Sequence, residues 1–217
     1  MTKEKTSNFR EIRAGEISPK TLYRSNHPIY GNSQVKEVVF SANEAKIRTI
    51  VNLSDSIPLL RSKLIFCPWY NKIFREKNVI SLGISMSFDI LESTFLKKIR
   101  RGIKFMLEHD PPYLIHCEAG MDRTGFFAML LESFMQAGID EMARDYMLSY
   151  VDAGAYSHID SELMFKFIVN TFSKIKGSPL SPDDSFELIA SNYLMEKLKL
   201  KQEELLALKG KLSYNAL

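Results

Sequence analysis

The stretch PPYLIHCEAGMDRTGFFAML, residues 111 to 130, decides how this sequence is interpreted. An apolar run ends at His116, small and polar residues follow, and a second apolar run begins just after Arg123. This order predicts a strand, a tight loop and a helix. A loop at a helix N-terminus directs several backbone N–H groups into one concavity, and such a concavity suits a tetrahedral dianion.

Cys117 stands at the mouth of this loop, six residues before Arg123. Amide dipoles and a guanidinium favour the thiolate, which is the nucleophilic form of a cysteine. The planar fork of Arg123 can hold two phosphate oxygens while phosphorus becomes trigonal bipyramidal, and Thr124 can donate a hydrogen bond to the sulfur. These residue types predict hydrolysis of a phosphate monoester with Cys117 as nucleophile. The expected phosphate-binding residues are Glu118, Ala119, Gly120, Met121, Asp122 and Arg123.

Composition sets the class of protein. The 217 residues are 45% hydrophobic and 25% charged, which is typical of a soluble globular domain. A net charge of +3 is too small to favour nucleic acid as a partner. No signal peptide and no apolar run of about 18 residues is visible, so we expect a cytoplasmic protein without a transmembrane segment; delivery into another cell stays open.

Short apolar runs alternate with longer segments of helical periodicity, which predicts an α/β domain with a mostly parallel sheet flanked by helices. The expected strands are residues 47–53, 78–84 and 113–116. The expected helices are residues 34–46, 91–108, 123–136, 140–150 and 159–176. Asp140 and Ser157 are the candidate N-caps of the last two helices.

The chain divides into four segments by composition. Residues 1–8 are polar, residues 9–176 form the catalytic domain, and the Gly- and Pro-containing residues 177–184 form a linker. Residues 185–217 form a C-terminal helical extension with a leucine stripe. One long helix that packs on its own domain is the simplest interpretation, and a dimer or partner contact through residues 185–212 is the alternative. The stripe consists of Leu194, Leu198, Leu205, Leu208 and Leu212.

Four quoted segments resemble one known family. The segment HCEAGMDRTG, residues 116–125, resembles the signature loop of the cysteine-dependent protein tyrosine and dual-specificity phosphatases. The segments SNFREIRAGEISPKTLYRSNHP (7–28), IRTIVNLSD (47–55) and DYMLSY (145–150) are similar to parts of the bacterial tyrosine phosphatases whose loop carries Asp-Arg-Thr-Gly. The resemblance implies the cysteine-phosphatase fold, a phosphocysteine intermediate, and no metal or organic cofactor.

The resemblance also implies a general acid that protonates the leaving oxygen and later activates water. Asp89, 28 residues before Cys117, lies where dual-specificity phosphatases carry a mobile acid loop. Asp122, inside the loop, matches the aspartate of some Asp-Arg-Thr-Gly enzymes. Asp89 is the first choice, because a separate loop can approach the leaving group from the side opposite the thiolate. The alternatives are a helix cap for Asp89 and an orienting partner of Arg123 for Asp122.

The substrate stays open at this level. Phosphotyrosine proteins are the first expectation, and phosphoinositides or inositol polyphosphates are the alternative. Many lipid-directed relatives carry lysine at the position of Met121, and Met121 and Glu118 make this loop less basic. A phosphate-binding module without activity is a second alternative, and a thiol oxidoreductase is disfavoured because no Cys-x-x-Cys is present. Arg24 is expected to be structural, and Cys67 to be packed or to form a reversible disulfide with Cys117.

Overall fold

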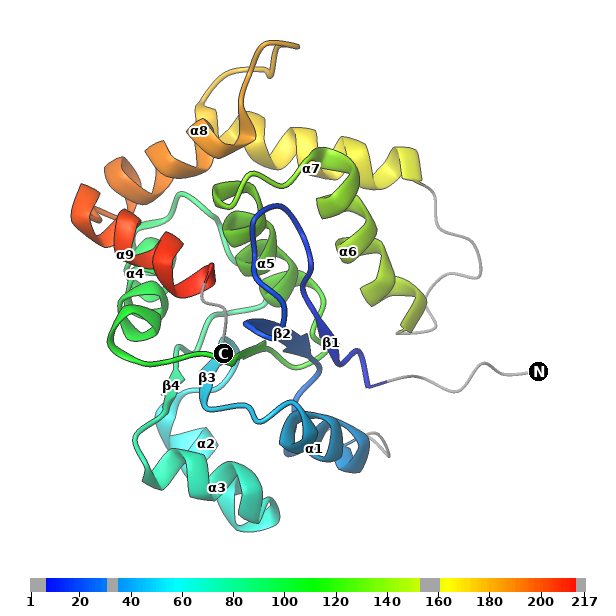
Figure 1. Cartoon of the computed structure of the whole chain (residues 1–217), viewed down its shortest axis with the longest axis vertical. Helices are drawn as coiled ribbons and strands as arrows, with labels where there is room; N and C mark the ends of the chain where they lie inside the picture. The colour runs from blue at the N-terminus through cyan, green and yellow to red at the C-terminus, as the bar shows by residue number, and fades with distance from the viewer. Residues whose placement is uncertain (1–6, 31–34, 153–160, 214–217) are drawn as a thin grey trace.

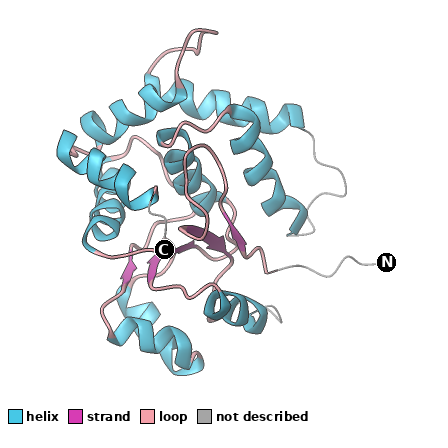
Figure 2. Cartoon of the chain, in the orientation of Figure 1, coloured by secondary structure: helices cyan, strands magenta, loops and turns pink. Residues whose placement is uncertain are grey.

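The computed structural model describes residues 7–30, 35–152 and 161–213. In these residues a sheet in the order β1-β2-β5-β3-β4 forms the centre of the molecule (Figure 2). The strands are β1 (Arg10–Glu11), β2 (Leu22–Ser25), β3 (Thr49–Asn52), β4 (Val79–Ser81) and β5 (Tyr113–His116). Only β1 runs antiparallel to its neighbour, and the other pairs are parallel. The expected α/β class with a mostly parallel sheet is confirmed.

The central strands bury both faces, because successive side chains point to opposite sides of a sheet. In β5, Leu114 belongs to one hydrophobic cluster, whereas Tyr113 and Ile115 belong to another. The cluster that contains Leu114 lies between the sheet and four helices: α1 (Val35–Glu44), α2 (Ile57–Lys63), the short helix η1 (Leu64–Phe66) and α3 (Pro68–Arg75). These helices form the lower layer of Figure 1.

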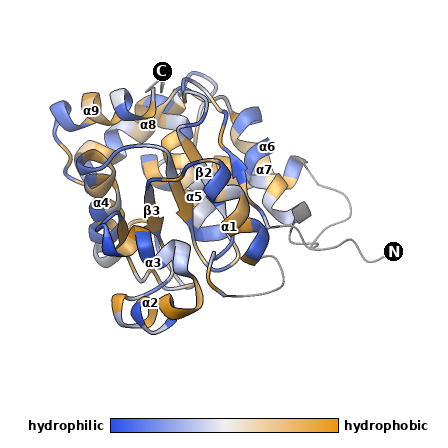
Figure 3. Ribbon diagram, turned by 60° about the horizontal axis from the view of Figure 1, so that its bottom comes forward, coloured by the Kyte–Doolittle hydropathy of each residue, from blue (hydrophilic) through white to orange (hydrophobic). Residues whose placement is uncertain are grey.

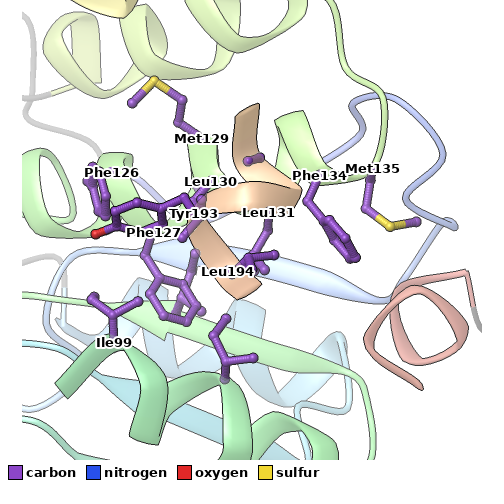
Figure 4. Packing of buried hydrophobic residues seen from close by; sticks show 14 of the residues in the cluster. Ile99, Phe126, Phe127, Met129, Leu130, Leu131, Phe134, Met135, Tyr193 and Leu194 are labelled. Atoms are coloured by element: carbon purple, nitrogen blue, oxygen red, sulfur yellow. The ribbon is translucent and has the colours of Figure 1, made fainter. Parts of the chain in front are cut away.

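The second layer contains the remaining helices above the sheet (Figure 1). They are α4 (Ser93–Glu108), α5 (Asp122–Phe134), α6 (Ile139–Asp152), α7 (Ser161–Lys176), α8 (Phe186–Asn192), the π-helical turn η2 (Tyr193–Lys197) and α9 (Gln202–Leu212). Every residue of α5 from Arg123 to Phe134 is buried, because α5 lies between the sheet and the outer helices. Figure 4 shows Phe127 of α5 near Ile99 of α4, and Leu131 of α5 near Leu194 of η2.

The expected elements agree with the structure to within a few residues, with two exceptions. Asp140 does not cap α6, since α6 begins at Ile139; instead the Glu141 carboxylate accepts from the N–H of Gly138 at 2.9 Å. The second exception is a set of elements that the sequence did not predict, because no clear hydrophobic periodicity marks them: β1, β2, α2, η1 and α3. Arg24 and Ser25 are buried in β2, so this strand lacks the apolar pattern that identifies a buried strand. Ser157 lies outside the described residues.

The C-terminal segment is two helices rather than one long helix. The helical path breaks near Lys199, whose φ is +56°, and α9 begins at Gln202. All five leucines of the stripe are buried in the same cluster as α5. Two hydrogen bonds add to this packing, from Tyr193 Oη to the carbonyl of Ile90 at 2.5 Å and from the N–H of Ser18 to the carbonyl of Leu212 at 3.0 Å. The stripe therefore packs on its own domain, whereas a dimer or partner contact through other side chains of residues 185–212 stays a prediction.

Candidate active site

The carboxyl ends of four neighbouring strands gather around the start of α5. The chain leaves β5 at Cys117, β2 at Asn26, β3 at Leu53 and β4 at Leu82. Parallel strands that end at one edge of a sheet create the crevice in which α/β proteins bind ligands. The loop 117–121 lies in this crevice and leads directly into α5.

Gly120 allows the loop to approach the backbone after β2. Its φ is +69°, and a Cβ at this position would lie 2.3 Å from the carbonyl oxygen of Ser25. Glycine adopts this left-handed conformation without steric cost, and alternation of left- and right-handed residues turns successive N–H groups to one side. Gly120 is therefore required by both the bend and the contact.

The carbonyl groups of the loop are held on its outer side. The N–H of His27 donates to the carbonyl of Glu118 at 3.0 Å, and Asn8 Nδ2 donates to the carbonyls of Ala119 and Gly120 at 3.2 and 3.0 Å. Arg24 Nη2 donates to the carbonyl of Gly120 at 2.8 Å. The carbonyl groups of residues 118 to 120 therefore have hydrogen-bond partners on the side of the loop that faces Asn8, Arg24 and His27.

The backbone N–H groups of residues 118 to 124 donate to no other described residue. The first N–H groups of a helix have no partner within the helix, and here the loop adds its own. The positive end of the α5 dipole acts in the same direction. This set of donors, called the nest below, follows Cys117 directly in the chain and has the character of a site that can bind an anion; Cys117 itself is only 2% exposed.

Arg123 lies at the edge of this nest with part of its hydrogen-bonding capacity unused. Its Nη1 donates to the carbonyl of Ile84 at 2.9 Å, and its Nη2 lies 3.8 Å from the carboxylate of Glu118. Its Nε is buried and has no partner among the residues that the structure covers. The guanidinium is thus held in the crevice with one buried donor left for a ligand.

Thr124 also has a buried polar group without a partner in the described part of the chain. Its hydroxyl is buried and makes no hydrogen bond to any described residue, including the Cys117 sulfur that the sequence suggested as its partner. A buried hydroxyl without a partner costs about 1–3 kcal/mol. The structure therefore retains an unfavourable group at the position where the proposed chemistry needs a donor.

The two candidate acids differ in their surroundings. Asp89 lies in the exposed connection between β4 and α4, where its carboxylate accepts from the N–H of Leu91 at 2.9 Å and pairs with Lys174 of α7 at 3.1 Å. The Leu91 N–H first, and then Lys174, lower the pKa of Asp89. The helix α4 begins after Glu92, so Asp89 stabilises the preceding turn and is not the cap of α4.

Asp122 is the first residue of α5 and is half-buried. Its carboxylate accepts from Tyr150 Oη at 3.4 Å. It lines a cavity of about 380 Å³ together with aromatic side chains that include Phe88 and Phe167, and Lys174 lies at the same cavity. Asp122 therefore belongs to the nest itself, whereas Asp89 is engaged outside it.

A buried ionic cluster lies behind the loop. Arg24 pairs with Asp145 of α6, and Arg10 Nε donates to the same carboxylate at 2.8 Å. Burial opposes ionisation of Asp145, but the two arginines hold its pKa below the ordinary value. Burial raises the pKa of the adjacent Glu132, and the Asp145 carboxylate raises it further. The structural role expected for Arg24 agrees with these contacts.

A second buried network lies under the other side of the loop. His116 Nδ1 faces its neighbouring carbonyl at 3.3 Å, which can only accept, so its Nε2 accepts from Tyr70 Oη at 2.9 Å. Burial lowers the pKa of His116 well below 6.5, which keeps the ring neutral. His27 Nε2 donates to Asp55 at 2.8 Å, because its Nδ1 accepts from the N–H of Ile29.

Sequence reasoning missed this second network. Asp55 also accepts from Tyr30 Oη at 2.9 Å and from Asn52 Nδ2 at 3.1 Å. Burial opposes the ionisation of Asp55, but its donors, His27 first and then Tyr30 and Asn52, outweigh burial and lower its pKa. Lys63 Nζ lies 3.1 Å from the centroid of the Tyr30 ring. A carboxylate directly after a predicted strand was the available signal, since strand ends meet at one edge of a parallel sheet.

Gly125 allows α6 to pack against the start of α5. A Cβ at this position would lie 2.2 Å from Cε2 of Tyr146, closer than any real contact. Cys67 does not join the site, because it is a free thiol buried in the other hydrophobic cluster.

The described residues contain neither a cluster of metal ligands nor a helix that could span a membrane. No group of three or more His, Cys, Asp and Glu side chains is placed to hold a metal ion among them. Within the same residues, no helix combines the length and the apolar character needed to cross a bilayer.

A sequence model described as the tyrosine phosphatase family matches residues 76–214. One similar solved structure is the core catalytic domain of the PP-IP phosphatase Siw14 from S. cerevisiae in complex with citrate, with 18% identity, coverage of 78% of this chain and 91% of that chain, and a TM-score of 0.44. Another is TpbA from P. aeruginosa in complex with phosphotyrosine, with 21% identity, coverage of 76% and 91%, and a TM-score of 0.42. No curated protein matches the sequence.

Proposed function

The chain belongs to the tyrosine phosphatase family and is a cysteine-dependent phosphatase, and on this premise we propose that Cys117 attacks phosphorus and carries the phosphoryl group as a phosphocysteine. The substrate that we propose first is a phosphotyrosine side chain of a protein, with dual specificity for phosphoserine and phosphothreonine left to the test below. No metal or organic cofactor takes part in this proposal.

One observation supports this proposal most strongly: the hydrogen-bond donors of the loop that follows Cys117 have no partner in the part of the chain that the structure describes. Seven consecutive N–H groups, the Nε of Arg123 and the hydroxyl of Thr124 have no partner among the described residues, while the loop carbonyls are tied back by Asn8, Arg24 and His27. A phosphoryl group with three oxygens would satisfy these donors at once. Donors organised before the reaction stabilise the charge that develops in the transition state.

The proposed reaction has two steps. The Cys117 thiolate forms a bond to phosphorus, the bond to the ester oxygen breaks, and the acid gives its proton to that oxygen. Water then attacks the phosphocysteine, the same carboxylate takes the proton of water, and the thiolate leaves with help from the Thr124 hydroxyl. The products are an alcohol or phenol and inorganic phosphate.

We favour Asp122 over Asp89 as the acid because of their contacts. A lowered pKa keeps Asp89 ionised, and its ion pair with Lys174 has to break before it can reach the crevice. Asp122 is already at the nest and lines a cavity with room for a leaving group. Asp89, the first choice from the sequence, remains the competing candidate.

The charge of the loop supports a monoester with one phosphate. The Glu118 carboxylate is 63% exposed and lies 3.8 Å from Arg123, so it repels further phosphates at the mouth. Lys63 is the nearby cation that could oppose this repulsion, and it is engaged with Tyr30 and Asp55. Phosphoinositides and inositol polyphosphates are therefore the second candidate substrates.

A substrate panel tests the proposal. Release of phosphate would be measured from an aryl phosphate, from phosphotyrosine, phosphoserine and phosphothreonine peptides, from phosphoinositides and from inositol hexakisphosphate, with and without a chelator. We expect turnover of the aryl phosphate and the phosphotyrosine peptide that a chelator leaves unchanged, that Cys117→Ser abolishes, and that Arg123→Lys lowers by about 10²–10³-fold. Turnover no greater than that of Cys117→Ser on every phosphoester would favour a binding module without activity.

A further inference from the structure

The three most exposed large hydrophobic side chains of the described residues gather on one layer of the molecule. Ile65 is 75% exposed, Phe66 is 70% exposed and Phe40 is 68% exposed. Ile65 and Phe66 belong to η1 and Phe40 to α1, and both elements lie in the layer below the sheet (Figure 1). Single exposed hydrophobic residues are common, but a group of this size marks an interaction surface.

Two of these three side chains lie at the same groove, and Ile65 is the neighbour of Phe66 in the sequence. Phe40 and Phe66 line a hollow of about 450 Å³, and the other lining residues come from α1 and from the start of α3. These are Val35, Lys36, Val39, Asn43, Cys67, Pro68 and Trp69. Figure 3 shows hydrophobic segments on α1 and α2 alternating with hydrophilic ones. Leu59 of α2, in the same layer, is 44% exposed.

The same segment carries a concentrated positive charge. Residues 57–77 contain five cations (Arg61, Lys63, Lys72, Arg75 and Lys77) against the single anion Glu76, a net charge of +4, whereas the whole chain has +3. Four of these cations are exposed, and the fifth, Lys63, is 21% exposed. Protruding apolar side chains among cations are the chemistry of a surface that binds an anionic bilayer.

We propose that this docking face, formed by Phe40, Leu59, Ile65 and Phe66 with the cations of residues 57–77, binds the surface of an anionic lipid bilayer. The apolar side chains enter the boundary between headgroups and acyl chains, and the cations face the anionic headgroups. A bilayer accommodates apolar and cationic groups together, whereas a second copy of this chain in a two-fold contact would place +4 against +4. Charge complementarity therefore selects the bilayer over self-association.

The docking face is linked to the crevice. Lys63, at the end of α2, lies 3.9 Å from Asp55 and over the ring of Tyr30. Asp55 accepts from His27, whose N–H holds the carbonyl of Glu118 in the nest. These contacts connect the end of α2 to the loop that forms the nest.

Flotation with vesicles of phosphatidylcholine, with and without phosphatidylserine, tests the proposal on the full chain. We expect binding only to the vesicles that contain phosphatidylserine, and a decrease as salt is raised, because screening shortens the reach of charges to about 8 Å at physiological ionic strength. We expect Ile65→Glu combined with Phe66→Glu to lower the vesicle-bound fraction by about tenfold or more, and Lys72→Glu combined with Arg75→Glu to do the same.

Matched variants control for general effects. Leu206→Glu changes a side chain of α9 that is 63% exposed, and Lys97→Glu with Arg100→Glu changes two exposed cations of α4; both should bind as the unchanged chain does. All these variants should hydrolyse a soluble aryl phosphate equally, which separates this proposal from the proposed function. Equal binding to both kinds of vesicle, or equal loss in the control variants, would overturn it. A dimer in solution that Phe66→Glu dissociates would overturn it in favour of self-association.

Discussion

Arg24 Nη2 donates a 2.8 Å hydrogen bond to the carbonyl oxygen of Gly120. Arg24 is fully buried, and its other terminal nitrogen pairs with Asp145 of α6. One guanidinium thus joins the outer side of the signature loop to a helix of the upper layer. It thereby holds a loop carbonyl, while the N–H groups of the loop have no partner among the described residues.

Replacement of Arg24 by lysine tests this link. A single ammonium cannot make the forked contact with both Asp145 and Gly120, so we expect kcat for an aryl phosphate to fall by about tenfold or more and stability to fall by about 1–3 kcal/mol. Arg13→Lys is the control, because the Arg13 side chain is 71% exposed and pairs only at the surface. Unchanged kcat in Arg24→Lys would show that the loop holds its shape without this bond.

Thr124 separates catalysis from stability. Because its buried hydroxyl has no partner among the described residues, Thr124→Val should leave the free energy of unfolding unchanged or raise it. The same change should lower kcat, since the sulfur loses its donor, and Thr124→Ser should restore most of it. Chemical denaturation and steady-state kinetics measure the two effects. A loss of stability with unchanged kcat would contradict the role given to Thr124.

Gly125 is expected to tolerate no side chain. In Gly125→Ala the new methyl group meets the Tyr146 ring at 2.2 Å, and we expect a loss of about 1–3 kcal/mol and a displaced nest with lower kcat. Gly210→Ala is the matched control in α9, where nothing lies within 4 Å of the new Cβ. That change should stabilise the protein by about 0.5–1 kcal/mol, because alanine favours a helix. Thermal unfolding compares the two; equal stability would mean that α6 moves aside.

The pH dependence of kcat distinguishes the two candidate acids. A general acid must be protonated, so kcat falls as pH rises through its pKa in the complex, and removal of the acid abolishes this limb. We expect Asp122→Asn to lower kcat by about 10²–10⁴-fold and to remove the limb, and Asp89→Asn to retain it. The reverse result would establish Asp89 as the donor and would show that its ion pair with Lys174 opens during turnover.

Glu132 makes stability depend on pH. Its folded-state pKa is raised above the ordinary value of 4.5, so the folded state binds more protons than the unfolded state above that pH. The contribution of Glu132 to the free energy of unfolding is fully present below a pH of about 4.5. It falls as the pH rises, by about 1 kcal/mol per pH unit, until the pH reaches the folded-state pKa. Glu132→Gln keeps the shape and the ability to donate to Asp145 without the titration. In urea unfolding from pH 5 to 8, the free energy of unfolding of Glu132→Gln should therefore rise relative to that of the unchanged chain as the pH increases. Parallel plots of the two free energies against pH would contradict this account.

Part of this architecture could be predicted from local patterns. The strand that ends at His116, the loop and the start of α5 followed from a change between apolar and polar residues over a few positions. The buried strand β2 and the helices α2 and α3 could not be predicted in this way. Arg24 is buried there because two distant groups, the carbonyl of Gly120 and the carboxylate of Asp145, pair with it, and no periodicity within the segment records those partners.

The sequence by itself determined the chemistry: a cysteine, an arginine and a threonine at the spacing of a strand, a nest and a helix start. Only the tertiary structure decided which donors remain free, because that depends on Asn8, Arg24 and His27, more than 90 residues away along the chain, holding the loop carbonyls. Only the fold engaged Asp89 with Lys174, buried the leucine stripe, and placed Phe40 beside Phe66. Local spacing specifies local geometry, whereas pairing between distant segments is decided by the packing of the whole domain.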